Sequence, residues 1–174
     1  MKKIILGVAV SLDSLIEGPN GEYDWCFADQ DYGMSEFFKR VDTVFLGRKS
    51  YELMQSMPES EVPGMPKMKE FVFSNTLEEV KPGSTIIRGD IGPQVKEIKK
   101  REGKDIWLFG GASLTTSLID LGLVDEFWLS VHPIILGAGK PMFQHLQERT
   151  LLELIESKTY STGLVSLRYK LKQL

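Results

Sequence analysis

The chain has 174 residues, of which 42% are hydrophobic and 26% are charged, as in an ordinary globular protein. This length suits one domain covering residues 1–174, and the net charge of −3 disfavours wholesale nucleic-acid binding. No apolar run approaches the roughly 20 residues that span a bilayer, and the start lacks a signal-peptide pattern, so we expect a cytoplasmic protein. The single cysteine, Cys26, excludes an internal disulfide and a thiolate metal cluster, and we expect no metal site.

The first predicted element is an apolar, β-rich run at residues 3–10. It lacks clear alternation of polar and apolar residues, which is typical of a central strand covered on both faces. Residues 11–21 then predict a loop that contains Asp13 and closes with turn signals at residues 18–21. Loops beside a central strand often form one side of a binding site.

A helix is predicted after the acidic residues Asp29 and Asp31, because the apolar residues at 34, 37, 38 and 41 share one helical face. Core packing is the simplest explanation for that aromatic face. A second short buried strand follows at residues 42–47.

That second strand ends on Gly47, and Arg48, Lys49 and Ser50 follow before an amphipathic helix. Two cations and a hydroxyl at a strand-to-helix turn suit a phosphate monoester, because arginine offers a planar fork of donors and the helix start adds its dipole. A solvated basic turn is the alternative. Residues 58–66 predict a loop.

Two further strands are predicted at residues 70–74 and 84–87. The first ends at Ser74 and Asn75, whose hydroxyl and amide groups are suited either to a ligand or to capping a turn. The second ends in Arg88. A helix that opens at residues 92–93 directs its apolar residues inward and its lysines outward.

The most informative stretch is the strand at residues 106–110, which runs into Gly110 and Gly111 and then directly into a helix that ends at Gly122. The first peptides of this helix present N–H groups beside two residues without side chains. Such a helix start binds anions, and a nucleotide diphosphate is the usual one. Plain turn chemistry is the alternative for the two glycines.

The last part of the chain predicts a strand at residues 125–132, a glycine-rich crossover at 134–143, and a hairpin formed by residues 151–160 and 165–171. The hairpin adds antiparallel strands at the edge of an otherwise parallel sheet. We place His132 in the strand before Pro133 and His145 in a surface helix. With only these two histidines, a Ser–His–Asp hydrolase or transferase is disfavoured.

Glycines and polar groups thus follow several strands, at residues 47–50, 74–75, 88 and 110–113. In an open α/β sheet, ligands bind outside the carboxyl ends of the strands, so these segments predict one dinucleotide-binding crevice. Arg48, Lys49 and Arg88 suit an additional phosphate and favour NADP over NAD. No ordinary Rossmann fingerprint follows a strand.

The run Val-Phe-Leu-Gly-Arg-Lys-Ser-Tyr-Glu at residues 44–52 resembles the Gly-Arg-x-Thr-x-Glu segment of the dihydrofolate reductase superfamily. Residues 72–75 and 106–112 are similar to the serine-bearing strand end and the diphosphate glycines of that family. The chain resembles in particular the stand-alone proteins similar to the C-terminal reductase domain of the riboflavin-biosynthesis deaminase-reductase. The resemblance implies a three-layer α/β fold with a mostly parallel mixed sheet, an antiparallel C-terminal hairpin and helices on both faces.

The strand ends and the resemblance together predict an NADPH site. Its residues are Ala9, Ile16, Gly47, Arg48, Lys49, Ser50, Ser74, Asn75, Arg88, Gly110, Gly111, Ala112, Ser113 and Leu114. The resemblance alone places Ala9 and Ile16 beside the nicotinamide, and Trp25, Met34, Phe38 and Met54 beside the substrate. It also implies a cis peptide bond between Gly110 and Gly111.

These patterns predict an NADPH-dependent reductase that transfers a hydride to a small heterocyclic or carbonyl substrate. The resemblance implies a substrate similar either to the riboflavin-pathway 5-amino-6-(5-phosphoribosylamino)uracil or to a pteridine such as dihydrofolate. Met34 stands where the folate reductases have an acid, so Asp13 and Asp31 are the candidate proton donors, with turn capping or solvation as the alternative. A non-catalytic NADP-binding protein is the second hypothesis, and the resemblance together with the apolar hairpin predicts a homodimer.

Overall fold

The structure is a computed structural model that describes residues 1–58 and 64–172. Its elements in chain order are β1 (Ile4–Val10), β2 (Leu15–Glu17), α1 (Met34–Arg40), β3 (Val41–Gly47), α2 (Arg48–Ser56), β4 (Lys69–Phe73), β5 (Ser84–Ile87), α3 (Ile91–Lys100), β6 (Asp105–Gly110), α4 (Ala112–Asp120), β7 (Glu126–Val131), β8 (Lys140–Pro141), β9 (Leu152–Thr159) and β10 (Val165–Leu171). Residues 59–63 of the predicted loop lie outside the described part.

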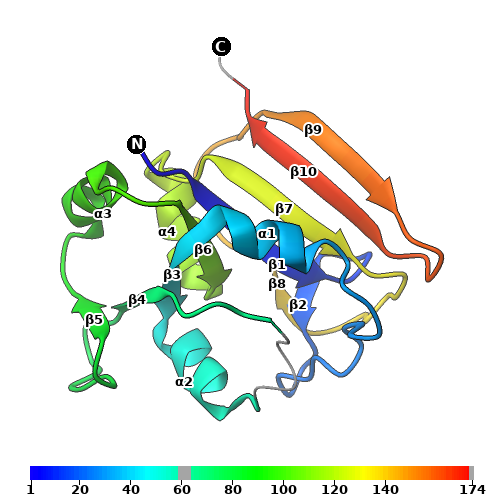
Figure 1. Ribbon diagram of the computed structural model, residues 1–174. Helices are drawn as coiled ribbons and strands as arrows, with labels where there is room; N and C mark the ends of the chain where they lie inside the picture. Colours follow the sequence, from blue (N-terminus) through cyan, green and yellow to red (C-terminus); the bar gives the residue numbers. More distant parts are fainter. Residues whose placement is uncertain (59–63, 173–174) are drawn as a thin grey trace.

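Eight of the described strands form one large sheet with the order β5-β4-β3-β6-β1-β7-β10-β9 (Figure 1). The strands from β5 to β7 are parallel, whereas β10 runs antiparallel to β7 and β9 antiparallel to β10. The first strand, β1, lies between β6 and β7 in the middle of the sheet. The predicted mixed sheet with an antiparallel hairpin at its edge is therefore confirmed.

Helices cover both faces of the sheet, so the molecule has three layers (Figure 1). Successive residues of β1 point to opposite faces: Ile4 and Leu6 pack in the core cluster that contains α3 and α4 residues, and Ile5 packs in the cluster that contains α1 and α2 residues. Both faces of β1 are buried, which explains why its sequence shows an unbroken apolar run.

The predicted end of α4 is also confirmed. Gly122 adopts a left-handed backbone with φ of +64°, and the N–H of Leu123 donates to the carbonyl of Leu118. This is the hydrogen-bond pattern of a glycine-terminated helix.

Several local predictions were wrong. Residues 15–17 and 140–141, predicted as loop and crossover, pair as the small antiparallel ribbon β2–β8. His145 lies outside any helix of the described chain and has a φ of +54°. Lys99 of α3 is buried rather than outward, because its Nζ donates to the Asp125 carboxylate at 2.6 Å and to the Leu123 carbonyl.

A charge cluster around the buried carboxylate of Glu126 lies at the amino ends of β1 and β7. The Glu126 carboxylate accepts from Lys3 at 2.7 Å and from Arg40 at 2.9 Å, and Arg168 lies 4.0 Å away. Burial alone would raise the pKa of Glu126, but the Arg40 guanidinium and the Lys3 ammonium together hold it below its ordinary value. Glu126 is therefore ionised and joins three cations from separate elements.

The substitution Glu126→Gln should lower the free energy of unfolding by about 3 kcal/mol, because it removes the buried carboxylate that the partly buried Arg40 and Arg168 guanidinium groups share. Denaturant unfolding monitored by circular dichroism measures the loss. The matched control is Glu97→Gln, whose ion pair with Lys100 is exposed and should contribute little. Equal effects of the two substitutions would show that the cluster does not stabilise the fold.

Candidate functional site

The carboxyl ends of five neighbouring strands lie side by side at one edge of the sheet. Gly47 of β3 is paired with Phe73 of β4, which is paired with Ile87 of β5, and Leu46 is paired with Gly110 of β6. Ala9 lies near the same end of β1, next to β6. The predicted segments after β3, β4, β5 and β6 are therefore aligned along one edge.

Gly47 and Gly111 are in close backbone contact at this edge. A Cβ atom added to Gly111 would lie 3.3 Å from the Gly47 Cα, and Gly110 and Gly111 have φ values of +146° and +103°. L-amino acids with side chains rarely adopt such angles. Both the spacing and the backbone conformation therefore require glycine.

Two helices begin at this contact, and no side chain caps either one. Helix α2 starts at Arg48 directly after Gly47, and α4 starts at Ala112 directly after Gly111. The two helices pack on opposite faces of the sheet, so their N-termini meet at its edge. The uncapped first-turn N–H groups and the positive ends of the two helix dipoles make these strand ends a candidate site for an anionic group.

The prediction of a cis bond between Gly110 and Gly111 was wrong. No peptide bond in the described ranges is cis. The chain instead reverses from β6 into α4 through the positive φ angles of both glycines, with a trans bond between them.

Basic side chains border the paired helix starts. The Arg48 guanidinium is about half exposed and lies 3.2 Å from the Glu52 carboxylate, one turn further along α2. Lys49 is exposed and lines a cavity of about 410 Å³ beside the β2–β8 ribbon, together with Glu17 and Lys140. An anion at the helix starts would meet cations on this side.

The remaining residues of the predicted cofactor site differ in what they offer. The Ser50 Oγ lies 3.6 Å from the position of a Cβ on Gly111, so its hydroxyl faces the glycine pair. Ser113 is exposed, whereas Ala112 and Leu114 are buried. Those two residues can contribute only backbone N–H groups. Ile16 is half-buried in β2.

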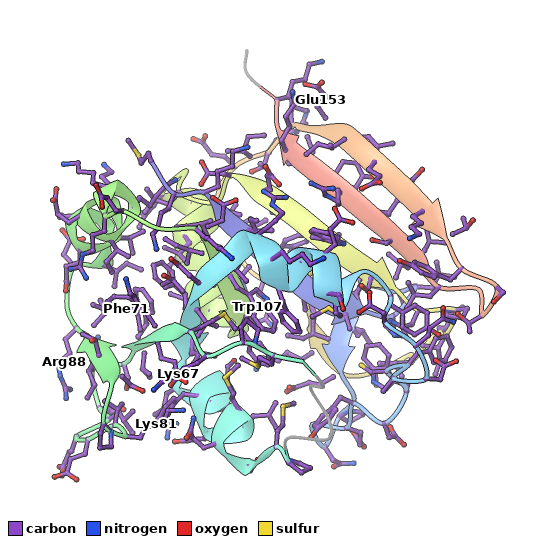
Figure 2. All side chains as sticks on the ribbon, viewed as in Figure 1. Lys67, Phe71, Lys81, Arg88, Trp107 and Glu153 are labelled. Atoms are coloured by element: carbon purple, nitrogen blue, oxygen red, sulfur yellow. The ribbon has the colours of Figure 1, made fainter. Side chains whose placement is uncertain are left out.

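Ser74, Asn75 and Arg88 hold a turn together rather than pointing free groups at a ligand. The Ser74 Oγ accepts from the N–H groups of Thr76 and Leu77, and the Asn75 Oδ1 accepts from the Gly89 N–H. Arg88, beside β5 in Figure 2, donates to the carbonyls of Asn75 and Leu77. These side chains therefore cap a turn, which was the alternative to ligand binding. The turn still lies beside the carboxyl ends of β4 and β5.

Asp13 fastens the loop after β1 to the glycine-rich crossover. Its carboxylate accepts from the Ser11 hydroxyl at 2.6 Å and from the N–H groups of Gly137 at 2.9 Å and Leu136 at 3.1 Å. The Ser11 hydroxyl, followed by the Gly137 amide, lowers the pKa of Asp13 to about 2. An acid that is ionised at neutral pH is a poor proton donor.

Asp31 caps the start of α1. Its carboxylate accepts from the Ser35 hydroxyl and from the N–H groups of Ser35 and Gly33, and the Ser35 hydroxyl contributes most to lowering its pKa. Turn capping, the structural alternative for both acids, is what the geometry supports. The structure offers neither acid in the neutral form that donates a proton.

The four predicted substrate residues fall in two places. Met34, Phe38 and Met54 all pack in one cluster around Trp107, which lies between α1 and α2 (Figure 2). Phe38 is buried and contributes mainly packing, whereas Met34 and Met54 are partly exposed. Trp25 lies apart, in the loop before α1, with its ring edge-on to His132 at 5.3 Å.

Sequence reasoning missed two features of the site. Phe109, in edge contact with Trp107 at 5.0 Å, adds a partly buried aromatic ring to the methionine cluster. Lys140 lines the cavity beside Lys49 because β8 pairs with β2. In the sequence, the glycine-rich crossover predicted at residues 134–143 is the signal for a segment near the site.

Within residues 1–58 and 64–172, no helix is long and apolar enough to cross a membrane. No group of three or more His, Cys, Asp or Glu side chains in those ranges is placed to hold a metal ion.

Comparisons with known proteins agree with this architecture. Residues 2–166 match the model of the RibD C-terminal domain. The uncharacterized protein YyaP of Bacillus subtilis (strain 168) is 45% identical, with 97% of this chain and 94% of that protein covered. A crystal structure of a Shewanella sp. PV-4 protein named for riboflavin biosynthesis is similar with a TM-score of 0.84 and 25% identity, covering 99% of this chain and all of that one.

A more distant structure shares the fold alone. Dihydrofolate reductase from Enterococcus faecalis, solved in complex with NADP(H), has a TM-score of 0.71 and 14% identity over 98% of this chain and 97% of that one. The predicted dihydrofolate reductase-like fold is therefore confirmed.

The glycine contact is open to a direct test with Gly111→Ala. The new Cβ meets the Gly47 backbone and the φ of +103° is strained for alanine, so we expect a loss of about 1–3 kcal/mol in the free energy of unfolding. The control is Gly122→Ala, which shares a positive φ but has open space around it. An equal loss in both variants, measured by denaturant unfolding, would mean that the contact itself imposes no constraint.

Proposed function

Because the chain belongs to the RibD C-terminal domain family, a reductase-related family, we propose that it is an NADPH-dependent reductase acting on a small heterocyclic or carbonyl substrate. The observation that supports this most directly is the pair of uncapped helix starts at the glycine contact. Their backbone N–H groups are the kind of donors that bind the diphosphate of a dinucleotide.

NADPH can fit this chain because the glycines at the helix starts have no Cβ atoms. A Cβ on Gly111 would occupy the space beside Gly47, and only glycines leave the amides of α2 and α4 accessible to a diphosphate. Arg48 is half-exposed at the same turn and is the residue that we assign to the 2′-phosphate. Lys49 and Lys140 lie beside the cavity and would offset the remaining negative charge.

When bound, NADPH supplies a hydride. The protein's own contribution is to hold the acceptor at a fixed distance and orientation. Met34, Met54 and Phe109 form the apolar surface on which we place the acceptor. Since Asp13 and Asp31 are ionised, we assign the accompanying proton to solvent rather than to either carboxylate.

The engaged carboxylates favour one alternative, a protein that binds NADP without catalysis. Asp13 and Asp31 are held by backbone amides and hydroxyls, and neither is positioned as a donor. Oxidation of NADPH in the presence of carbonyl or pteridine acceptors separates the two functions. A fall in absorbance at the nicotinamide band supports the reductase, and binding without any such fall supports the alternative.

We also propose that the chain forms a homodimer through β9. Every residue of this edge strand is exposed, among them Leu152, Leu154 and Ile155, although the strand has only β10 as a neighbour. An apolar edge strand with open backbone groups invites a second strand. A second copy of β9, related by a two-fold axis, would pair with it antiparallel.

Removal of the Arg48 guanidinium should weaken NADPH more than NADH. We expect Arg48→Ala to cost about 1.5–3 kcal/mol in NADPH binding, roughly 10- to 100-fold in Kd, with little change for NADH, which lacks the 2′-phosphate. Isothermal titration calorimetry with both cofactors measures the difference.

The matched control is Lys170→Ala, which removes one positive charge from β10, far from β3 in the strand order. It should leave both affinities unchanged. Equal losses for NADPH and NADH in Arg48→Ala would remove the assignment of Arg48, and the absence of any NADPH binding by the wild type would overturn the proposed function.

Placing a charge on β9 tests the homodimer. Leu154→Lys should convert a dimer into a monomer, because it puts a cation into the proposed apolar contact, and light scattering after size-exclusion chromatography reports the mass. Ile135→Lys, at an exposed loop position, is the control and should leave the mass unchanged. A wild-type protein that is monomeric at all concentrations would disprove the interface.

A further inference from the structure

His132 lies at the carboxyl end of β7, directly beside the site's edge, and is only 3% exposed. Its own backbone N–H donates to the carbonyl of Val10, the last residue of β1. The imidazole Nδ1 lies 2.9 Å from the Ser130 carbonyl, and the Nε2 lies 3.1 Å from the backbone nitrogen of Phe27. Both ring nitrogens therefore have backbone partners.

These two partners determine the protonation state of the ring. A carbonyl can only accept, so Nδ1 carries the hydrogen, and a backbone N–H can only donate, so Nε2 must keep its lone pair. Neutral imidazole satisfies both contacts. Imidazolium does not, because a proton on Nε2 would point at the N–H of Phe27.

The contact joins the sheet to the long loop between β2 and α1. Phe27 is separated from His132 by 105 residues, and the rings of Trp25 and Phe27 lie edge-on to the imidazole at 5.3 and 5.1 Å. Trp25 and Phe27 come from the loop, Ser130 from β7 and Val10 from β1, and none of these four has a titratable side chain. The loop's own acids Asp24 and Asp29 are near in sequence, and Asp29 accepts from the Tyr32 hydroxyl.

We propose that neutral His132 is the positioning residue for the loop of residues 18–33, and that protonation of its Nε2 releases this loop from the sheet. Release removes the Phe27 hydrogen bond and exposes the imidazole to solvent. That α1, which follows the loop and carries Met34, then loses its fixed place beside the substrate surface rests on the proposed function, whereas the loop release itself does not.

The direction of the pH dependence follows from burial. Burial lowers the pKa of His132 below its ordinary value of about 6.5, so the released loop binds a proton more readily than the docked one. The docked form is therefore favoured above about pH 6.5 and loses stability as the pH falls below that value, by up to tenfold in its equilibrium per pH unit.

The chain contains just two histidines, which makes the test direct. Histidine side-chain resonances of the wild-type protein are followed by NMR between pH 8 and pH 4. We expect His132 to titrate below the ordinary histidine value of about 6.5. The Phe27 amide should lose hydrogen-exchange protection over the same range, by up to about tenfold per pH unit.

The variant His132→Gln supplies the second arm, because a glutamine amide oxygen can accept from Phe27 and does not titrate. Its Phe27 protection should be independent of pH. Titration of His132 at or above the ordinary histidine value of about 6.5, or wild-type Phe27 protection that does not respond to pH, would overturn the proposal. If the variant does not fold, the wild-type titration alone decides. The measurement needs no cofactor, so a protein that binds no NADPH can still support or refute this inference.

Discussion

The contact between Gly47 and Gly111 determines where two helices on opposite faces of the sheet begin. Because the two backbones approach within the width of a side chain, β3 and β6 must end at the same level and α2 and α4 must start together. Open α/β sheets bind ligands where successive helices leave for opposite faces, and this pair of strands is such a point. The short distance between Gly47 and Gly111 thus accounts both for the register of β3 against β6 and for the position of the candidate site.

The two halves of the site are built from different parts of the chain. The half assigned to the cofactor consists mostly of backbone amides, with Arg48 and Lys49 as its exposed charges. The half assigned to the acceptor consists of apolar side chains around Trp107. A backbone cradle tolerates most side-chain changes outside its glycines, whereas a side-chain surface is altered by each substitution. This difference explains why the substrate is harder to infer than the cofactor.

The parts of the fold that depend on neighbouring residues were predictable. A strand followed by glycine and then an amphipathic run predicted the turns at Gly47 and Gly111, and Gly122 predicted the end of α4. What was missed depends on partners far along the chain. The carboxylate of Asp13 meets Gly137, Lys99 is buried through Asp125, and the Phe27 amide meets His132. No local pattern encodes these pairings, because only the closed tertiary structure brings the groups together.

The central position of β1 has a consequence for biosynthesis. Ile5 pairs with Trp107 on one side and with Glu126 on the other, so β1 gains these neighbours only after about a hundred or more further residues have been synthesised. Until then its apolar side chains lack the strands that cover them. A nascent chain with such distant pairings folds late and exposes apolar surface until it does. This protein should therefore depend on chaperones during translation more than a protein whose strands pair in local hairpins.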